Sequence, residues 1–326
     1  MDAGYYKIPS LKGLWYRGRY TTAGVQPGAL DVVPQSESQV DLIVMLLRAL
    51  TLTLAGAAGL AAQADSSWTE PFPPHHVAGN IYYVGSKGLA SYLITSSSGH
   101  ILINSNLESS VAQIRASIEK LGFAFGDVKI LLISHAHWDH CAGSALVKQL
   151  TGAKYMVMDA DVPEIEAGGK GNFQYGNSPG SLYKTTKVDR VLHDGDTVKL
   201  GDSVLTARLT PGHTKGCTTW TLKATEAGKT YDVVIMGSPN VNPGYKLVSN
   251  ALYPRIAEDY ATMFRVLKSL PCDIFLGAHG EYYGMEAKFA RMKTGPANPF
   301  VDPEGYKAYV ASKEQSYLAE LKRQMK

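Results

Sequence analysis

One short run of the sequence concentrates side chains that bind metal ions. Residues 134–140 read S-H-A-H-W-D-H, which places three histidines and one aspartate within six positions. Imidazole and carboxylate groups are ligands that hold zinc in proteins. The spacing i, i+2, i+4, i+5 fits the end of a strand and a tight turn better than one helix face. We expect His135 and His137 to point the same way and Asp139 and His140 to turn toward a second position, which predicts a two-metal site.

Two more histidines each follow an apolar segment that is expected to be a strand. His213 lies in a T-P-G-H-T turn after residues 204–209, and His279 lies in a G-A-H-G turn after residues 273–276. Either one alone would be an ordinary hydrogen-bonded surface group. Because three strand ends finish in histidine, the chain supplies five imidazoles and a carboxylate, enough for two zinc ions with open positions for water. The other histidines lie in turn-like or polar contexts and are not expected to be ligands: His75, His76, His100 and His193.

The elements that must position these residues alternate between strands and helices. Apolar residues at helical spacing, closed by Gly122, predict a helix from Val111 to Leu121. An apolar strand at 128–133 leads into the histidine run, so the cluster lies at the carboxyl end of a strand, where α/β folds usually hold their sites. Further helices are expected at 143–150, 258–269, 285–293 and 303–324.

Short β-branched and aromatic runs between turn residues predict the remaining strands. They lie at 81–84, 91–95, 100–104, 154–158, 190–192, 197–200, 204–209, 218–222, 233–236 and 273–276. The order of strands and helices gives two similar halves, which predicts an α/β (α+β) fold with four layers, an αβ/βα sandwich. The Gly-, Asn- and Ser-rich segment 167–187, with exposed-looking Phe173, Tyr175 and Tyr183, is expected to be a long functional loop.

Composition excludes several classes of protein. The chain has 326 residues, of which 45% are hydrophobic and 19% charged, as in ordinary globular proteins. A net charge of +3 without a basic, aromatic-rich patch does not indicate nucleic acid as a partner. The three cysteines lack zinc-ribbon spacing and are too few for a disulfide framework, although their number allows one disulfide and a free thiol. Nothing in the sequence indicates an oligomeric state.

The N-terminal region reads as a targeting segment. Met45 and Arg48 precede an apolar stretch that ends in an A-x-A site before Asp65, so residues 45–64 are interpreted as a secretory signal peptide. The stretch is too short and too rich in alanine and glycine for a stable membrane span. Residues 1–44 are then an upstream extension, and residues 65–326 form a single domain that is expected in the periplasm or outside the cell.

Taken together, the H-A-H-W-D-H run, the P-G-H-T turn and the late G-A-H resemble the metallo-β-lactamase superfamily over roughly residues 68–293. The resemblance implies the metallo-β-lactamase fold, which is an αβ/βα sandwich, and two Zn²⁺ ions as cofactors. It also implies two sets of metal ligands. His135, His137 and His213 match the first zinc site, and Asp139, His140 and His279 match the second.

Ser238 indicates the branch of the superfamily. Many superfamily hydrolases carry a metal-bridging aspartate after the strand at 233–236, whereas this chain has Gly237 and Ser238. A serine has no anionic oxygen that could bridge two cations. Subclass B1 lactamases carry cysteine at this point and subclass B3 typically serine, so the chain resembles subclass B3.

This resemblance implies zinc-dependent hydrolysis of a β-lactam amide, a small-molecule substrate, by a metal-bound hydroxide. The first zinc would polarise the carbonyl and the second would accept the departing nitrogen. Asp139 would be catalytic, because it would orient the hydroxide as well as hold the second zinc. Ser238 and Asn240 would lie near or bind the substrate, and the loop at 167–187 would cover it.

Two positions depart from the family pattern. Asn240 stands where subclass B3 enzymes often carry a second serine, and Asn104 stands where the superfamily usually carries an aspartate that supports the metal ligands.

Two alternative functions stay open. One is a superfamily hydrolase that acts on a lactone or thioester, and the other is a zinc-binding module without catalysis.

Overall fold

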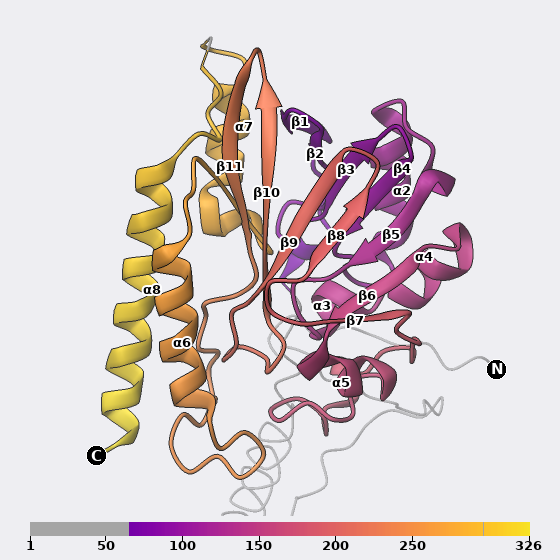
Figure 1. Ribbon diagram of the computed structural model, residues 1–326. Coiled ribbons are helices and arrows are strands. Elements are labelled where there is room, and N and C mark those ends of the chain that lie inside the picture. Colours follow the sequence, from indigo (N-terminus) through magenta and orange to yellow (C-terminus); the bar gives the residue numbers. More distant parts are fainter. Residues whose placement is uncertain (1–64, 296) are drawn as a thin grey trace, which may run out of the picture. The chain divides into compact units, whose positions relative to one another are not determined.

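The computed structural model describes residues 65–295 and 297–326 and contains two β-sheets, one from each half of this part of the chain (Figure 1). The predicted upstream extension and signal peptide lie outside the described residues. The first sheet has seven strands in chain order: β1 His75–Ala78, β2 Ile81–Tyr83, β3 Tyr92–Ser96, β4 Gly99–Ile103, β5 Val128–Leu132, β6 Lys154–Met158 and β7 Arg190–Leu192. The second sheet, ordered β12-β11-β10-β9-β8, has five: β8 Thr197–Leu200, β9 Ser203–Leu209, β10 Thr218–Glu226, β11 Lys229–Met236 and β12 Ile274–Gly277.

Each sheet combines antiparallel and parallel pairs. In the first sheet, β1 to β4 pair antiparallel and β4 to β7 pair parallel. In the second sheet, β8 to β11 pair antiparallel and β11 pairs parallel with β12, with Met236 opposite Gly277. Because parallel neighbours end at the same edge of a sheet, the segments that follow β11 and β12 leave the second sheet side by side.

Helices cover the outer face of each sheet, which confirms the predicted four-layer sandwich (Figure 1). Helices α2 (Ser110–Lys120) and α4 (Ser144–Thr151) pack on the first sheet, and α6 (Ile256–Ser269) and α8 (Pro303–Gln324) pack on the second. The shorter helices are α3 Trp138–Cys141, α5 Val162–Glu166 and α7 Met285–Arg291. Single 3₁₀ turns occur at η1 Ser66–Trp68, η2 Phe125–Asp127, η3 Asp159–Asp161, η4 Pro179–Ser181 and η5 Gly280–Tyr283.

The strand that leads into the histidine run is buried on both faces. Ile130 and Leu132 of β5 point into the core between the two sheets, while Val128 and Leu131 point into the core under α2 and α4. A parallel strand between two apolar layers therefore appears in the sequence as a mostly apolar run rather than an alternating one, here interrupted by the exposed Lys129. This double burial fixes the position at which β5 ends and the ligand run begins.

Several details differ from the sequence predictions, and the short helices α3 and α5 are among the unpredicted elements. His75 and His76 belong to strand β1 rather than to a turn. Strands β10 and β11 are longer than predicted and are joined at Ala227 and Gly228, whose φ angles of +48° and +79° fit a type I′ hairpin turn. The aromatic residues of the loop at 167–187 are half-buried rather than exposed, and Tyr175 is one of them.

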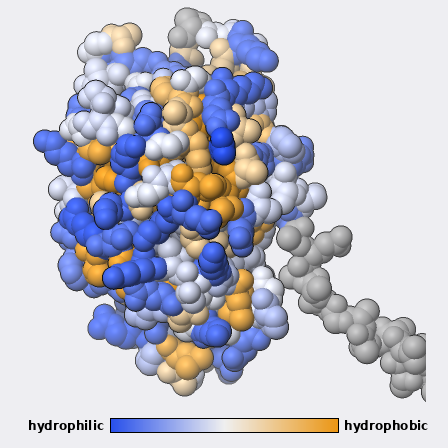
Figure 2. Space-filling view, turned by 90° about the vertical axis from the view of Figure 1, so that its right-hand side faces the viewer, coloured by the Kyte–Doolittle hydropathy of each residue, from blue (hydrophilic) through white to orange (hydrophobic). Residues whose placement is uncertain are grey.

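The outer surface is mixed in character. On the face at the right of Figure 1, hydrophilic side chains predominate and hydrophobic residues gather near the centre (Figure 2). Among the helices of the described ranges, none combines the length and the apolar composition that crossing a bilayer would require.

Candidate metal centre

The six predicted ligands lie together where strands of both sheets end. His135 comes shortly after β5, and Asp139 and His140 lie in the single turn of α3. His213 lies in the connection from β9 to β10, and His279 follows β12. Two sheets therefore contribute to one cluster, because the carboxyl ends of strands β5, β9 and β12 meet at the same end of the sandwich.

His135, His137 and His213 form the first group. Their rings stand edge to face, with centroids 4.8 Å apart for His135 and His137, 4.6 Å for His135 and His213 and 4.7 Å for His137 and His213. One ring nitrogen from each lies within 4.8 Å of the other two, and all three residues are buried. Three buried imidazoles whose nitrogens converge in this way can hold one metal ion.

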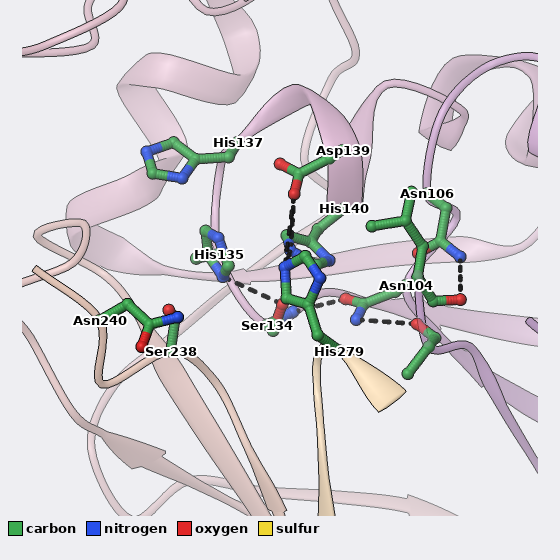
Figure 3. A network of polar contacts seen from close by, with 12 residues as sticks. Asn104, Asn106, Ser134, His135, His137, Asp139, His140, Ser238, Asn240 and His279 are labelled. Carbon is green, nitrogen blue, oxygen red and sulfur yellow. Dashed lines mark hydrogen bonds and ion pairs between the residues drawn. The ribbon is translucent and has the colours of Figure 1, made fainter. Parts of the chain in front are cut away.

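Asp139, His140 and His279 form the second group (Figure 3). The Nε2 atom of His140 lies 3.1 Å from Oδ2 of Asp139 and 3.1 Å from Nε2 of His279, and the latter lies 3.5 Å from the same carboxylate oxygen. His135 also groups with Asp139 and His140, because its ring lies 4.4 Å from that of His140. The two groups are therefore adjacent, and His135 of the first group lies next to Asp139 and His140 of the second.

The protonation of the cluster suits a metal. Burial, followed by neighbouring imidazoles, lowers the pKa of His135 and His137 well below the ordinary value. Burial likewise lowers the pKa of His213 to about 4 and that of His279 to about 3, so these rings are neutral at pH 7. Burial alone would raise the pKa of Asp139, but His140 and His279 lower it, so the carboxylate is ionised. Neutral imidazole and ionised carboxylate are the metal-binding forms.

The hydrogen bonds of the histidines leave nitrogens for a cation. The Nδ1–H group of His213 donates a hydrogen bond to the carbonyl oxygen of Asn240 at 2.8 Å, which leaves Nε2 for a metal. His135 uses Nδ1 on Ser134 Oγ at 3.1 Å, and its buried Nε2 has no hydrogen-bond partner. A buried polar atom without a partner is costly. The donor set therefore fits zinc, and a cation would satisfy the unpaired nitrogen.

Asp161 supports the first group from behind and was missed by the sequence analysis. Its carboxylate is 2% exposed and accepts hydrogen bonds from Ala136 N at 2.9 Å, Thr214 Oγ1 at 2.8 Å and Gly216 N at 2.7 Å. Ala136 lies inside the histidine run and Thr214 follows His213. One buried carboxylate thus joins the two connections that carry the first group. Only its place after an apolar strand could have suggested this role.

Asn104 supports the cluster through the backbone. Its Oδ1 accepts a hydrogen bond from Ser134 N at 2.8 Å, and its Nδ2 donates to the carbonyl of Ala90 at 3.3 Å (Figure 3). The residue is fully buried and adopts a φ of +67°, a conformation that asparagine tolerates better than most residues. Asn104 therefore fixes the residue before His135 and makes no hydrogen bond to a ligand side chain.

Ser238 and Asn240, which follow β11, meet at Tyr282. The Ser238 Oγ atom lies 3.1 Å from Tyr282 Oη, and Asn240 Nδ2 donates to the same hydroxyl at 3.1 Å. Ser238 is 2% exposed and does not line the cleft beside the ligands, whereas Asn240 and Tyr282 do. Asn240 therefore lines the cleft, whereas Ser238 is connected to the cleft wall by its contact with Tyr282.

A cleft of about 540 Å³ opens beside the ligands His137, Asp139, His213 and His279. Other lining residues include Trp68, Lys87, Trp138, Asn240, Asn242, Glu281 and Tyr282. The loop at 167–187 lies next to this cleft but none of its residues lines it. Instead, the ring of Tyr175 packs 5.3 Å from that of His137 and 5.3 Å from that of Trp138, so the loop supports a ligand from the side.

Comparisons with known proteins agree with this geometry. A family profile described as "Metallo-beta-lactamase superfamily" matches residues 88–279. The native FEZ-1 metallo-β-lactamase from Legionella gormanii is 57% identical, with a TM-score of 0.78 over 78% of this chain and 98% of that one. BJP-1, a subclass B3 metallo-β-lactamase of Bradyrhizobium japonicum, is 38% identical, with a TM-score of 0.75 over 80% and 97%. The class B3 di-zinc enzyme LRA-12 from an Alaskan soil metagenome is 34% identical, with a TM-score of 0.75 over 78% and 97%.

Curated relatives match over shorter stretches. The chain is 34% identical to the cytoplasmic hydroxyacylglutathione hydrolase of Arabidopsis thaliana over 90 residues, which are 27% of each chain. It spans less than half the length of the curated relatives that it matches, between 27% and 48%. The chain belongs to the metallo-β-lactamase superfamily and is an enzyme of that type. Within the superfamily it resembles the subclass B3 enzymes, as the sequence analysis predicted.

Proposed function

We propose that this enzyme hydrolyses the amide bond of β-lactams with two zinc ions. The observation that carries the proposal is the convergence of five imidazoles and one carboxylate beside an open cleft. It is supported by the match to FEZ-1, BJP-1 and LRA-12 over nearly their whole length. LRA-12 is described as a di-zinc enzyme, which supports the same number of metal ions here.

Each group of ligands would hold one zinc. His135, His137 and His213 would hold the first, and Asp139, His140 and His279 the second. When bound, zinc polarises carbonyl oxygens and lowers the pKa of a water molecule to about 7, which supplies a nucleophile at neutral pH.

The protein's own groups hold this arrangement and orient the substrate. Asp139 is the one carboxylate among the six clustered ligands, and its free lone pairs would orient the attacking water. Asn240 lines the cleft, and Tyr282 accepts one hydrogen from its amide at 3.1 Å. That contact leaves the second amide hydrogen for the carboxylate of a substrate. The bond from His213 Nδ1 to the Asn240 carbonyl fixes the imidazole tautomer.

Ser238 favours a lactam over the alternative substrates, because many other superfamily hydrolases carry a metal-bridging aspartate at this position. A carboxylate at this position would bring a second anion to the cluster, whereas Ser238 is neutral, buried and turned toward Tyr282. The second candidate function is hydrolysis of a lactone or thioester, which the short match to hydroxyacylglutathione hydrolase favours. Rates on a chromogenic cephalosporin, a homoserine lactone and a glutathione thioester, measured side by side, separate the two candidates.

Metal removal tests the proposed chemistry. Zinc-loaded protein is expected to hydrolyse a chromogenic cephalosporin, to lose that activity on dialysis against a chelator and to regain it with added zinc. Metal content by mass spectrometry should follow the same course. Full activity in protein shown to contain no metal would contradict the proposal.

Asp139→Ala tests the role of the carboxylate. Loss of a second-site ligand that also orients the water is expected to lower kcat by about 10²–10⁴-fold, the range for a positioned proton-transfer group. The variant should retain its first zinc, because the first group of ligands is unchanged. Thr151→Ala, in a half-buried position at the end of α4, is the control. Wild-type turnover in Asp139→Ala would contradict the assigned role.

We also propose that residues 45–64 are a signal peptide that directs the enzyme to the periplasm or out of the cell. The proposal is supported by the positive start, the apolar stretch and the A-x-A site before Asp65. N-terminal sequencing of protein from its host is expected to begin near Asp65. Secreted protein with an intact Met1 would contradict it.

A further inference from the structure

The end of helix α8 contacts the segment between β11 and α6, which forms one wall of the cleft through Asn240 and Asn242 (Figure 1). The contact is made by the side-chain amide of Gln324. Its Nε2 donates to the carbonyl of Tyr245 at 2.7 Å, and its Oε1 accepts from the backbone N–H of Leu247 at 2.7 Å. Gln324 therefore pairs with this segment as a neighbouring strand would.

Tyr245 connects this contact to the metal ligands. Its side chain is 2% exposed, and its hydroxyl donates to the carbonyl oxygen of His213 at 3.0 Å. The same hydroxyl lies 3.4 Å from Nε2 of His137. The backbone of Tyr245 is thus held by Gln324 while its side chain touches two ligands of the first group.

A second contact of α8 supports the same segment. The ring of Tyr317 stacks on that of Tyr260, with centroids 5.4 Å apart and an interplanar angle of 20°. The hydroxyl of Tyr260 donates to the carbonyl of Asn240 at 2.6 Å, which is the oxygen that His213 Nδ1 also contacts. This stack supports the segment near Asn240, and Gln324 supports its distal part, where the ring of Tyr245 also packs 5.0 Å from that of Phe173.

We propose that Gln324 is a positioning residue for the active site. By pairing with Tyr245 and Leu247 it sets the place of the Tyr245 hydroxyl, and through it the orientation of His137 and His213 and the shape of the cleft wall. The kinetic part of this inference rests on the proposed function. The structural part does not, because it concerns how one segment is held.

The hydrogen bonds of Gln324 have a measurable consequence. Leu247 is 3% exposed, so without Gln324 its buried N–H would lack a partner. The segment would then open more often to reach water. Exchange of the amide hydrogens at 245–247 is expected to become about tenfold faster, the change that one or two lost hydrogen bonds produce.

The experiment uses the zinc-loaded full chain with two substitutions and one matched control. Gln324→Ala removes the side chain, and Gln324→Met keeps its length without its hydrogen bonds. Lys322→Ala is the control, since Lys322 is exposed in the same turn of α8. The readouts are amide exchange at 245–247 by mass spectrometry, the visible absorption spectrum of the cobalt-substituted enzyme, and KM and kcat for a chromogenic cephalosporin.

Both Gln324 variants are expected to show faster exchange, a shifted cobalt spectrum and a KM raised about fivefold, the factor that one hydrogen bond supplies, with a smaller change in kcat. Lys322→Ala should match the wild type. Unchanged exchange in Gln324→Ala would overturn the pairing. Faster exchange with an unchanged spectrum and unchanged KM would overturn the positioning role. If the wild type hydrolyses no β-lactam, the proposed function fails, and exchange and the cobalt spectrum still decide the role of Gln324.

Discussion

Asp161 provides a direct test of how the first group of ligands is held. Its buried carboxylate accepts three hydrogen bonds, from Ala136, Thr214 and Gly216. Asp161→Ala removes the acceptor and leaves three donors, two of them backbone N–H groups, around a buried position. Asp161→Asn keeps one carbonyl oxygen but turns an amide toward donors.

The expected size of the effect follows from these contacts. A buried donor that loses its partner costs about 1–3 kcal/mol, so three give roughly 3–9 kcal/mol in Asp161→Ala, and less where a donor relaxes toward water. This is a large fraction of the roughly 5–15 kcal/mol by which folded domains are stable. Groups behind metal ligands typically change metal affinity about 10–100-fold, and the same loss of zinc affinity is expected here. Asp161→Asn should show about half of each effect.

The assay combines denaturant unfolding of metal-free protein with zinc competition against a chromophoric chelator. Burial raises the pKa of Asp161 above its ordinary value, so the measurements are made at pH 7.5 to favour the ionised carboxylate. Asp159→Ala is the matched control, since Asp159 lies in the same 3₁₀ turn and, among the described residues, forms hydrogen bonds with the exposed His193 at 3.1 Å and with the N–H of Ala160. The reasoning fails if the free energy of unfolding of Asp161→Ala lies within about 1 kcal/mol of that of Asp159→Ala and the two variants bind zinc equally tightly.

Two further predictions concern residues outside the ligand set. Burial lowers the pKa of His75 from 6.5 to about 4, so the unfolded chain binds a proton that the folded chain does not, and the unfolding free energy falls by about 3 kcal/mol as pH drops from 6.5 to 4. His75→Phe should remove that part of the loss in urea titrations at several pH values, and equally steep losses in both proteins would contradict it. Tyr282→Phe removes the hydroxyl that holds Asn240 and should raise KM about threefold with kcat nearly unchanged, since one neutral hydrogen bond is lost. Steady-state kinetics that show an unchanged KM would exclude this role of Tyr282.

The sequence allowed the clustered side chains to be predicted because each lies in a local pattern. The histidine run follows a largely apolar strand, and His213 and His279 each follow another strand, so the strand ends could be located without knowing the fold. The same applies to Ser238, which follows β11 directly. Parallel pairing places the ends of β11 and β12 at one edge of the second sheet, and the packing of the two sheets brings that edge to the end of β5.

Apart from Asn104, the supporting residues could not be predicted in this way. Asp161, Tyr245 and Gln324 act through hydrogen bonds to backbone groups far away in the chain, and such bonds leave no spacing or residue pattern in the sequence. The length of the β10–β11 hairpin was missed because its type I′ turn has alanine at position 227, where asparagine or aspartate is the usual signal.

The ligands come from both sheets, which gives a bound metal a mechanical role. A first-site zinc would tie the end of β5 in one sheet to the connection between β9 and β10 in the other, and a second-site zinc would tie α3 to the segment after β12. Each ion would then act as a cross-link between the two halves of the sandwich. Because any ligand that binds only the folded chain stabilises it by mass action, zinc supply would govern how long the folded enzyme survives as well as how fast it works.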